Sequence, residues 1–277
     1  MNKVLTLTLG TLMAAGVNAA TTTINGKSVS AAYTRTAVSS ATSPKTGATY
    51  KITTNSLGQA TGIAVKSASG SQASFDYTSS IYSLGGGQVY AYRSSNGLQS
   101  ALAVNPNYFD WSYQSFGVWN KASSNGSGTV SAGTFGTVIT QGASIPKTGS
   151  AIYSGVAGGM AAVGSNNAFY VTADMMAITN FATRSILFST YNSAASSSPT
   201  GYYNYVSGLD LSGTLTYTSN TNSFSGTVSN LGGGGIPATR GTASGQFYGP
   251  SAQEIGGVFA LKTGNAGYIG GFGGKRP

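Results

Sequence analysis

Apolar and polar residues alternate most regularly in the second half of the chain. Between residues 209 and 218, Leu, Gly and Tyr alternate with Asp, Ser and Thr, and the alternation resumes at residue 223 after a polar turn. A period of two is the pattern of an antiparallel strand with one buried and one solvated face. From residue 151 onward the pattern predicts eight strands, at about 151–158, 168–178, 185–191, 209–218, 223–228, 239–247, 256–262 and 267–274.

A glycine recurs in the middle of several of these strands, at Gly213, Gly226, Gly245, Gly257 and Gly270. Glycine inside a strand weakens a sheet, so its repetition needs a structural reason. Sharp coiling of a small closed barrel, or space inside one, supplies that reason. Eight strands are enough to close a barrel whose interior is just filled by side chains. We therefore predict a C-terminal eight-stranded antiparallel β-barrel.

The first half of the chain shows shorter strand patterns. Runs bounded by Gly, Ser and Asn clusters predict strands at 50–54, 61–65, 88–92, 98–104, 108–119 and 135–140. Residues 20 to 45 predict a loose, Thr- and Ser-rich segment with one short strand near 30–36. The polar segment 141–150 contains Pro146 and predicts a domain boundary. The fold class is all-β, with a β-rich domain at 20–144, a barrel domain at 145–277 and no helix longer than one turn.

Four aromatic side chains gather in the first domain, namely Trp111, Tyr113, Phe116 and Trp119. They fit a binding surface, but aromatic side chains commonly dominate β cores. The core interpretation is favoured here.

Composition supports a folded protein and excludes several chemistries. Only 7% of the residues are charged and 41 are Gly, but 17 Tyr and 11 Phe provide apolar area to bury. The chain has no His and no Cys. This excludes disulfides, Cys/His zinc sites, His-ligated haem and triads with a His base.

The carboxylates do not form a catalytic pattern in the sequence. Asp76, Asp110, Asp174, Asp210 and Glu254 are at least 34 positions apart, and no phosphate loop, nucleophile elbow or calcium loop is present. We predict that the protein is not an enzyme and has no catalytic or metal residues. A glycan-degrading enzyme would require two carboxylates about 5–10 Å apart across a cleft.

Residues 1–19 have the features of a secretory signal peptide. Lys3 precedes an apolar run that ends near Val17, and Val17-Asn18-Ala19 resembles a cleavage site. The alternative is a buried N-terminal strand. We expect export across the inner membrane to the periplasm, the cell surface or the medium, with no transmembrane segment in the mature chain. No Cys follows the run, so a lipoprotein is not expected.

The net charge of +9 comes from scattered basic residues, and only Lys275 and Arg276 are adjacent. A nucleic-acid site normally clusters its cations, so no nucleic-acid partner is predicted. The diffuse charge instead favours acidic partners or anionic cell surfaces. Lys147 and Arg240 are candidates for contact with an anionic ligand, although ordinary surface charge explains both.

Three tyrosines, Tyr202, Tyr203 and Tyr205, lie in a predicted loop at about 192–208. Exposed loop tyrosines are large, amphipathic recognition groups, and we take these three as candidate ligand contacts. The alternative is that they pack over a barrel end.

The stretch from Phe247 to Phe259 predicts two strands joined by a short helical turn. Pro250 suits the first helical position, and Gly256 with Gly257 is expected to end the turn and reverse the chain. Glu254, the only glutamate, is expected to accept hydrogen bonds from free backbone N–H groups beside the turn.

The amino-acid sequence of this stretch resembles the barrel signature of transferrin-binding protein B-like proteins of Gram-negative bacteria. That signature has the form G-x-F-Y-G-P-x-A-x-E-x-G-G-x-F. Here the pattern is carried by Gly245, Phe247, Tyr248, Gly249, Pro250, Ala252, Glu254, Gly256, Gly257 and Phe259. Residues 115–119 and 145–155 also resemble this group. The resemblance is strong over 145–277 and weaker over 20–144, where it implies the family's β-rich handle domain.

The resemblance implies a secreted or surface protein that binds a host or environmental ligand without catalysis. The expected ligand is an iron source, either a transferrin-like protein or haem, and an outer-membrane translocator or TonB-dependent receptor is a further expected partner. No cofactor is expected. Haem is compatible only as a cargo held without His, for example by Tyr. The alternative is an adhesion or colonisation factor that binds anionic cell-surface material.

Overall fold

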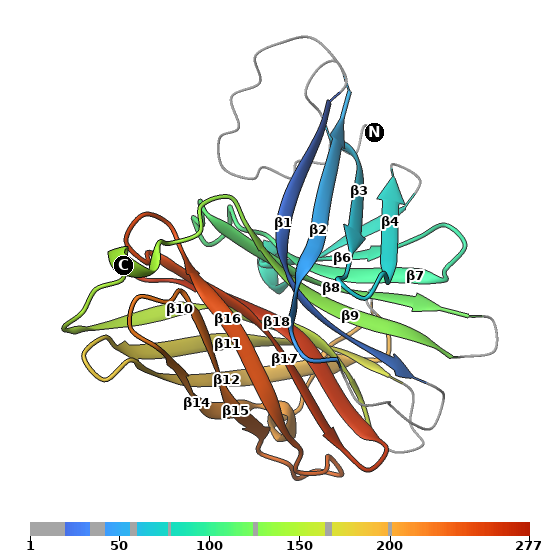
Figure 1. The fold of residues 1–277 in the computed structure, drawn as a ribbon. Coiled ribbons are helices and arrows are strands. Elements are labelled where there is room, and N and C mark those ends of the chain that lie inside the picture. The colour runs from blue at the N-terminus through green and yellow to red at the C-terminus, as the bar shows by residue number, and fades with distance from the viewer. Residues whose placement is uncertain are drawn as a thin grey trace.

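The computed structural model describes residues 20–33, 42–55, 60–76, 79–123, 127–163, 168–198 and 201–277. The predicted signal peptide at 1–19 lies outside the described residues. The described chain forms two large antiparallel sheets that are joined by residues 137–149 (Figure 1).

The first sheet, which we call the handle, has nine strands in the order β4-β3-β2-β1-β9-β8-β7-β6-β5. Its strands are β1 (Ala20–Tyr33), β2 (Lys45–Thr54), β3 (Ala60–Lys66), β4 (Gln72–Asp76), β5 (Ser80–Leu84), β6 (Val89–Arg93), β7 (Gln99–Val104), β8 (Gln114–Ala122) and β9 (Gly128–Gly136). A 3₁₀ turn, η1 (Gly85–Gly87), joins β5 to β6.

The second sheet closes into a barrel because β11 pairs with β10 on one side and with β12 on the other. Its strands are β10 (Ser150–Ala162), β11 (Phe169–Asn180), β12 (Ser185–Ser196), β14 (Leu211–Tyr217), β15 (Ser223–Asn230), β16 (Arg240–Tyr248), β17 (Glu254–Thr263) and β18 (Ala266–Lys275), with the short β13 (Asn204–Tyr205) beside β12. The 3₁₀ turns are η2 (Gly142–Ser144) and η3 (Ser207–Leu209). The predicted all-β class and eight-stranded barrel are confirmed.

The barrel interior is filled by apolar side chains, and the largest of them are aromatic. Phe224, Phe247, Phe259 and Phe272 are fully buried there. Three of the recurrent glycines, Gly245, Gly257 and Gly270, make room for these rings. A Cβ at Gly245 would come within 2.5 Å of the Phe224 ring, and one at Gly257 within 2.5 Å of the Phe272 ring. The strand glycines are therefore required by packing inside a small barrel.

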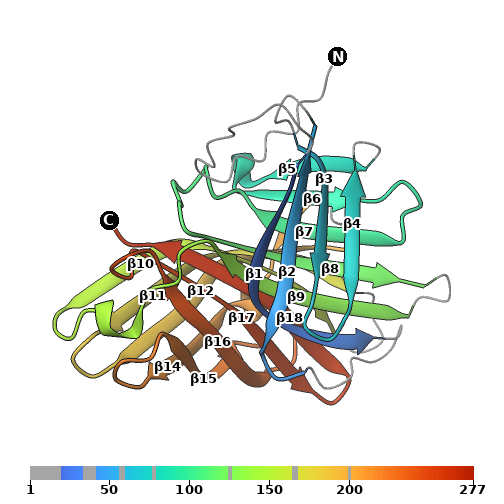
Figure 2. The ribbon, with the colours of Figure 1, turned by 45° about the horizontal axis from the view of Figure 1, so that its top comes forward.

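The handle sheet curls so that β4 approaches β7 and β8 (Figure 2). Its inner face buries Tyr50, Phe75, Trp119 and Phe135, and the cavity left among them is only about 30 Å³. The handle therefore has a packed core of its own.

A further apolar core joins the handle to the barrel, where β8 and β9 lie across β17 and β18 (Figure 1). Phe116 and Val118 of the handle pack with Val258 and Ile269 of the barrel, and all four are buried. Full burial of one such side chain stabilises the fold by roughly 1.5–3 kcal/mol. Trp111 also lies in this core and Trp119 lies in the handle core, whereas Tyr113 is partly exposed. The core interpretation is confirmed for the two tryptophans and Phe116.

Several local predictions were wrong in the first half of the chain. The segment expected to be loose is a central strand, β1, of 14 residues. It is paired on both sides, by β2 and β9, which compensates for its few large apolar residues. Two short strands, β4 and β5, were missed. The strand expected at 108–119 begins only at Gln114, because residues 106–111 form a hydrogen-bonded turn in which Asp110 has a φ of 54°.

The turn in the 247–259 stretch also differs from the prediction. Residues 249–252 form a turn that is not helical, and β17 begins at Glu254. Gly256 and Gly257 therefore lie inside β17, where their amides and carbonyls face β16 and β18. The predicted domain limits at residues 144 and 145 stay a prediction.

Candidate functional site

The two ends of the barrel differ, and we name them by what they carry. The linker end holds residues 137–149, the turns after β11, β14 and β16, and the C-terminus, whose Arg276 amide donates to the Gln253 carbonyl at 3.0 Å. The loop end is opposite and holds residues 201–210, residues 231–239 and the turn between β17 and β18.

Two buried polar side chains fix the loop end. The Asn230 amide donates to the Gly208 carbonyl at 2.7 Å and to the Pro237 carbonyl at 3.0 Å, and its oxygen accepts from the Thr239 amide. The Asp210 carboxylate accepts from the Ser193 amide at 2.9 Å. These bonds connect both loops to the barrel rim, so the loops are held in one arrangement.

Apolar side chains project from these fixed loops. Tyr202 is 86% exposed, Tyr205 65% and Leu231 63%. They are the three most exposed large apolar side chains of the part of the chain that the structure describes. The two loops touch, because the Gly232 amide donates to the Gly208 carbonyl and the Leu231 amide donates to the Asp210 carbonyl, each at 3.0 Å. Exposed anchors on a fixed support are what a recognition surface needs.

Tyr203 is placed differently from its two neighbours. It is partly buried and packs against the apolar core between handle and barrel. Burial raises the pKa of its hydroxyl, and the nearby Tyr170 adds to that increase. The Tyr170 hydroxyl in turn is hydrogen-bonded to Ser100 of β7. The three predicted tyrosines therefore do not share one surface: Tyr202 and Tyr205 face solvent, and Tyr203 lies toward the handle.

The second loop has a shape that only glycine adopts easily. Gly232, Gly233, Gly234 and Gly235 all have positive φ, from 60° to 99°. Leu231 precedes this run, and the exposed Arg240 follows it at the start of β16. Sequence reasoning missed Leu231. The only available signal was a lone leucine beside a glycine run, and that pattern is common in buried strand ends.

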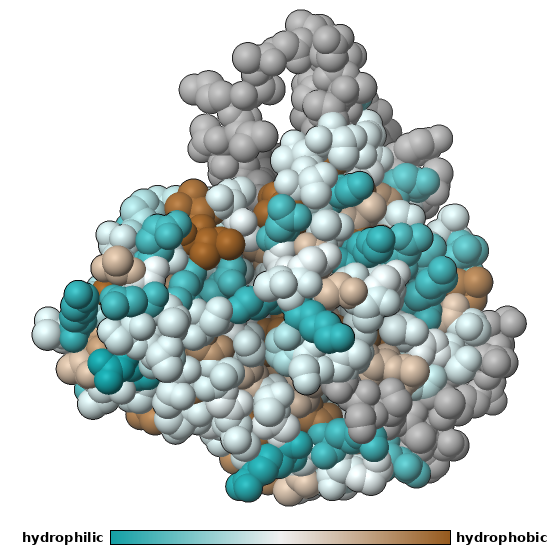
Figure 3. All heavy atoms as spheres, in the orientation of Figure 1, coloured by the Kyte–Doolittle hydropathy of each residue, from teal (hydrophilic) through white to brown (hydrophobic). Residues whose placement is uncertain are grey.

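The surface of the molecule is otherwise mostly polar on the face shown in Figure 3, where brown side chains form small separate patches. Isolated apolar residues of this kind are normal on a soluble surface. The loop end differs in that its two touching loops carry the three most exposed of these side chains.

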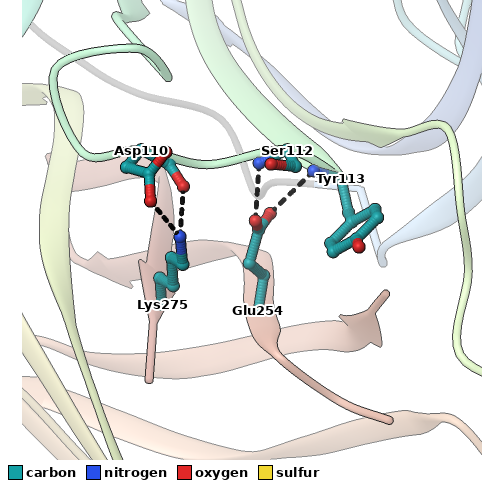
Figure 4. Close-up of polar contacts among 5 residues, drawn as sticks. All are labelled: Asp110, Ser112, Tyr113, Glu254 and Lys275. Atoms are coloured by element: carbon teal, nitrogen blue, oxygen red, sulfur yellow. Dashed lines mark hydrogen bonds and ion pairs between the residues drawn. The ribbon is translucent and has the colours of Figure 1, made fainter. Parts of the chain in front are cut away.

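Glu254 lies at the linker end and is fully buried. Its carboxylate accepts hydrogen bonds from the amides of Ser112 (2.6 Å) and Tyr113 (3.0 Å) (Figure 4). It also accepts one from the Gln114 amide at 3.0 Å. The expectation that it binds backbone N–H groups is confirmed, but they belong to the handle rather than to its own turn.

The charge balance around Glu254 is uneven. Burial raises the pKa of its carboxyl group, and the three amides and Lys275 act in the opposite direction. Lys275 itself pairs with Asp110 at 2.5 Å (Figure 4). These contacts connect the handle to the barrel and leave Glu254 without access to a substrate.

Two of the remaining carboxylates take part in hydrogen bonds to other groups. Asp174 accepts from the Asn192 amide group at 2.8 Å, and Asp210 supports the loop end. Within the described ranges, no three His, Cys, Asp or Glu side chains gather as metal ligands would. In the same ranges no helix has the length and apolar character needed to cross a bilayer.

Comparison with known proteins gives a family for the barrel. Residues 145–276 match the family model described as the C-lobe and N-lobe beta barrels of Tf-binding protein B. No curated protein matches the chain in sequence.

Solved structures with a related fold come from the same group of proteins. A mutant of transferrin-binding protein B from Haemophilus parasuis Hp5 aligns with a TM-score of 0.50 and 18% identity over 85% of this chain and 48% of that chain. A mutant of the protein from Actinobacillus pleuropneumoniae H49 aligns with a TM-score of 0.48 and 12% identity over 91% of this chain and 99% of that chain. The protein from serogroup B Neisseria meningitidis aligns with a TM-score of 0.44 and 14% identity over 85% of this chain and 60% of that chain. The chain spans about half the length of the first of these structures. At 18% identity, the likeness to the Haemophilus parasuis structure shows a shared fold.

Proposed function

We propose that this chain, whose residues 145–276 match the barrels of Tf-binding protein B, is a non-enzymatic binding protein that holds its ligand at the loop end. One observation carries the proposal. The most exposed large apolar side chains described, Tyr202, Tyr205 and Leu231, sit on two loops that buried polar groups hold in place.

The proposed ligand is a protein that carries iron, of the transferrin type. The related structure from Haemophilus parasuis Hp5 is named as a transferrin-binding protein, which supports this class. The geometry also suits it, since aromatic anchors that project outward fit a partner with matching hollows. Haem is the second form of iron source. It would need an axial ligand other than His, and Tyr202 or Tyr205 supplies the phenol oxygen that such ligation requires.

The proposal includes export. The apolar segment after Lys3 supports secretion across the inner membrane of a Gram-negative cell. An outer-membrane translocator or a TonB-dependent receptor is the proposed partner on the bacterial side, and a host iron carrier is the proposed partner outside.

The second candidate function is adhesion to anionic cell-surface material. The net charge of +9 supports it, together with the presence of a single ion pair, Lys275–Asp110, in the described part of the chain. Most cations are therefore free to attract acidic groups. Such binding weakens as salt rises.

A binding panel tests the proposal. The purified protein is immobilised and exposed to iron-loaded human transferrin, iron-free human transferrin and human lactoferrin at 0.15 M and 0.5 M salt, and a solution sample is titrated with haemin. We expect saturable binding of at least one iron carrier that persists at the higher salt. A shift of the haemin Soret band would identify haem as the ligand instead. No response in any of these arms would overturn the iron-source proposal, and binding to heparin at 0.15 M but not at 0.5 M salt in a parallel arm would then favour adhesion.

A further inference from the structure

The linker end contains a cavity that the proposed function does not use. It measures about 90 Å³ and is enclosed by three segments: Gly142–Lys147 of the linker, Phe181–Arg184 after β11, and Tyr217–Asn220 after β14. A cavity that holds one water molecule has only about 10–15 Å³ open to the centre of a water-sized sphere. The larger volume here leaves room for a small organic group. We propose that this pocket binds an organic carboxylate.

The charge of the pocket favours an anion. Lys147 and Arg184 both line it, and no acidic residue does. Neither cation has a carboxylate partner within the described ranges, where the only ion pair is Lys275–Asp110. Arg presents several N–H donors in one plane, which matches the two oxygens of a carboxylate.

A buried donor completes the site. Tyr217 is 8% exposed, and its hydroxyl has no hydrogen-bond partner in the structure. Its ring is held by edge-on packing against Phe247 at 5.3 Å between centroids, and its amide donates to the Arg184 carbonyl at 3.2 Å. Burial raises the pKa of this hydroxyl and the charge of Arg184 lowers it, so the two groups sense each other. A buried hydroxyl without a partner is uncommon, and a ligand oxygen would satisfy it.

The apolar part of the lining selects for an organic anion over an inorganic one. Ile145 and Phe181 are buried side chains that line the cavity. Pro146, which stands between Ile145 and Lys147 in the sequence, lines it as well. These groups would contact the hydrocarbon part of the ligand, while Lys147, Arg184 and the Tyr217 hydroxyl would bind its carboxylate. Sulfate or phosphate would leave the apolar wall unused.

The walls are fixed before any ligand arrives. Arg184 and Asn220 adopt left-handed backbone conformations, with φ of 57° and 59°. Gly142 approaches the Asn220 carbonyl so closely that a Cβ would collide with it. The linker is thus seated against the turn after β14, and a pre-formed pocket loses less entropy on binding.

Chemical-shift titration tests this site with benzoate as the probe, benzamide as its uncharged match, and sodium sulfate as an inorganic anion. We expect saturable amide shifts within residues 142–147, 181–184 and 217–220 for benzoate, and at least tenfold weaker binding of the other two probes. The double variant Lys147→Ala/Arg184→Ala should weaken benzoate binding at least tenfold. Tyr217→Phe should weaken it about threefold without lowering the melting temperature, because its hydroxyl has no partner in the free protein.

The controls separate this site from the loop end. Arg240→Ala removes a cation at the loop end and should leave benzoate binding unchanged, as should Tyr202→Ala/Tyr205→Ala. N-acetylglutamate methylamide and N-acetylneuraminate, added in parallel, tell a protein-borne carboxylate from a sugar acid by their relative affinities. Three results would overturn the inference: no shifts with benzoate, equal shifts with benzamide or sulfate, or benzoate shifts that persist in the Lys147→Ala/Arg184→Ala variant.

Discussion

The linker end and the loop end of the barrel use the same kinds of residue in opposite ways. At the linker end, the Tyr153 hydroxyl donates to the Ala252 carbonyl at 2.7 Å, Tyr248 bonds Thr134 at 3.0 Å, and Glu254 accepts three amides of the handle. At the loop end, Tyr202 and Tyr205 face solvent. The difference teaches that tyrosine content alone does not locate a binding surface, because burial decides whether the phenol stabilises the fold or meets a partner.

The polar residues show the same contrast. The side chains of Asp210 and Asn230 form hydrogen bonds within the barrel domain that hold its loops. Glu254 and Lys275 instead bond to residues of the handle domain. We infer that the contacts between handle and barrel at the linker end carry stability, and that the loop end carries recognition of the proposed protein ligand. Substitutions at the two ends should therefore change different measurements.

The largest expected effect is on stability at the linker end. Glu254→Ala removes the acceptor of three handle amides, and it should lower the free energy of unfolding by about 3–5 kcal/mol. Urea unfolding monitored by tryptophan fluorescence measures it. Asp174→Ala is the matched control, since that carboxylate is partly exposed, and it should change stability by less than about 0.5 kcal/mol. If the free energy of unfolding of Glu254→Ala stayed within 1 kcal/mol of the wild-type value, the assignment of stability to the linker end would be contradicted.

At the loop end the expected effect is on binding. Tyr202→Ala/Tyr205→Ala should weaken binding of the iron carrier found in the panel at least tenfold, or about 1.4 kcal/mol and more, because exposed aromatic anchors dominate such surfaces. Its unfolding midpoint should match that of wild type. Tyr191→Ala is the control: this tyrosine is 44% exposed on the barrel wall, and its loss should leave affinity unchanged. Equal losses in both variants would show that the loops are not the recognition surface.

Alkaline pH should lower the stability that buried tyrosines contribute, and Tyr248 provides the test. Burial raises the pKa of Tyr248 to about 12, against the lowering effect of its bond to Thr134. The folded pKa is above the unfolded value, so this contribution to stability is complete below about pH 10 and is lost as pH rises toward 12, by about 1.4 kcal/mol per unit.

The comparison for this prediction is Tyr248→Phe, which cannot ionise. Its stability should be about 1 kcal/mol below wild type at pH 8, through loss of the Thr134 bond, and the gap should shrink or reverse by pH 12. Urea unfolding at both pH values measures the gap. A gap that stays constant with pH would contradict the assigned pKa.

The smallest expected effect concerns the ion pair at the joint. The Asp110 side chain is 90% exposed, so its pairing with Lys275 is screened by solvent. Asp110→Asn should reduce stability by about 0.2–1 kcal/mol at low salt and by less at 1 M salt, as unfolding midpoints will show. A loss as large as that of Glu254→Ala would mean that the surface pair, and not the buried carboxylate, fastens the handle.

How far the sequence predicts this structure depends on the range of the interactions. The barrel strands were predicted to within a few residues because period-two alternation is local. Most of β1 was missed because its Thr, Ser and Ala residues become a central strand only through partners 17–34 positions away in β2 and 95–109 positions away in β9. The partners of Glu254 lie 140 to 142 positions upstream, so only their type could be anticipated.

The candidate site shows the same limit. The loop tyrosines could be selected from composition and context, but the inward placement of Tyr203 depends on Tyr170 and the handle core. Leu231 and the pocket lined by Lys147, Arg184 and Tyr217 arise from turns that meet only in the closed barrel. Lys147 was a candidate contact to an anionic ligand from the sequence alone, but Arg184 and Tyr217 were not.

Hydrogen exchange with and without iron-loaded human transferrin tests the central claim most directly. Residues 201–210 and 231–239 should exchange more slowly in the complex, and residues 249–254 at the linker end should exchange at the same rate in both samples. Protection at the linker end or on the handle alone, or no protection anywhere at saturating transferrin, would contradict the assignment of recognition to the loop end.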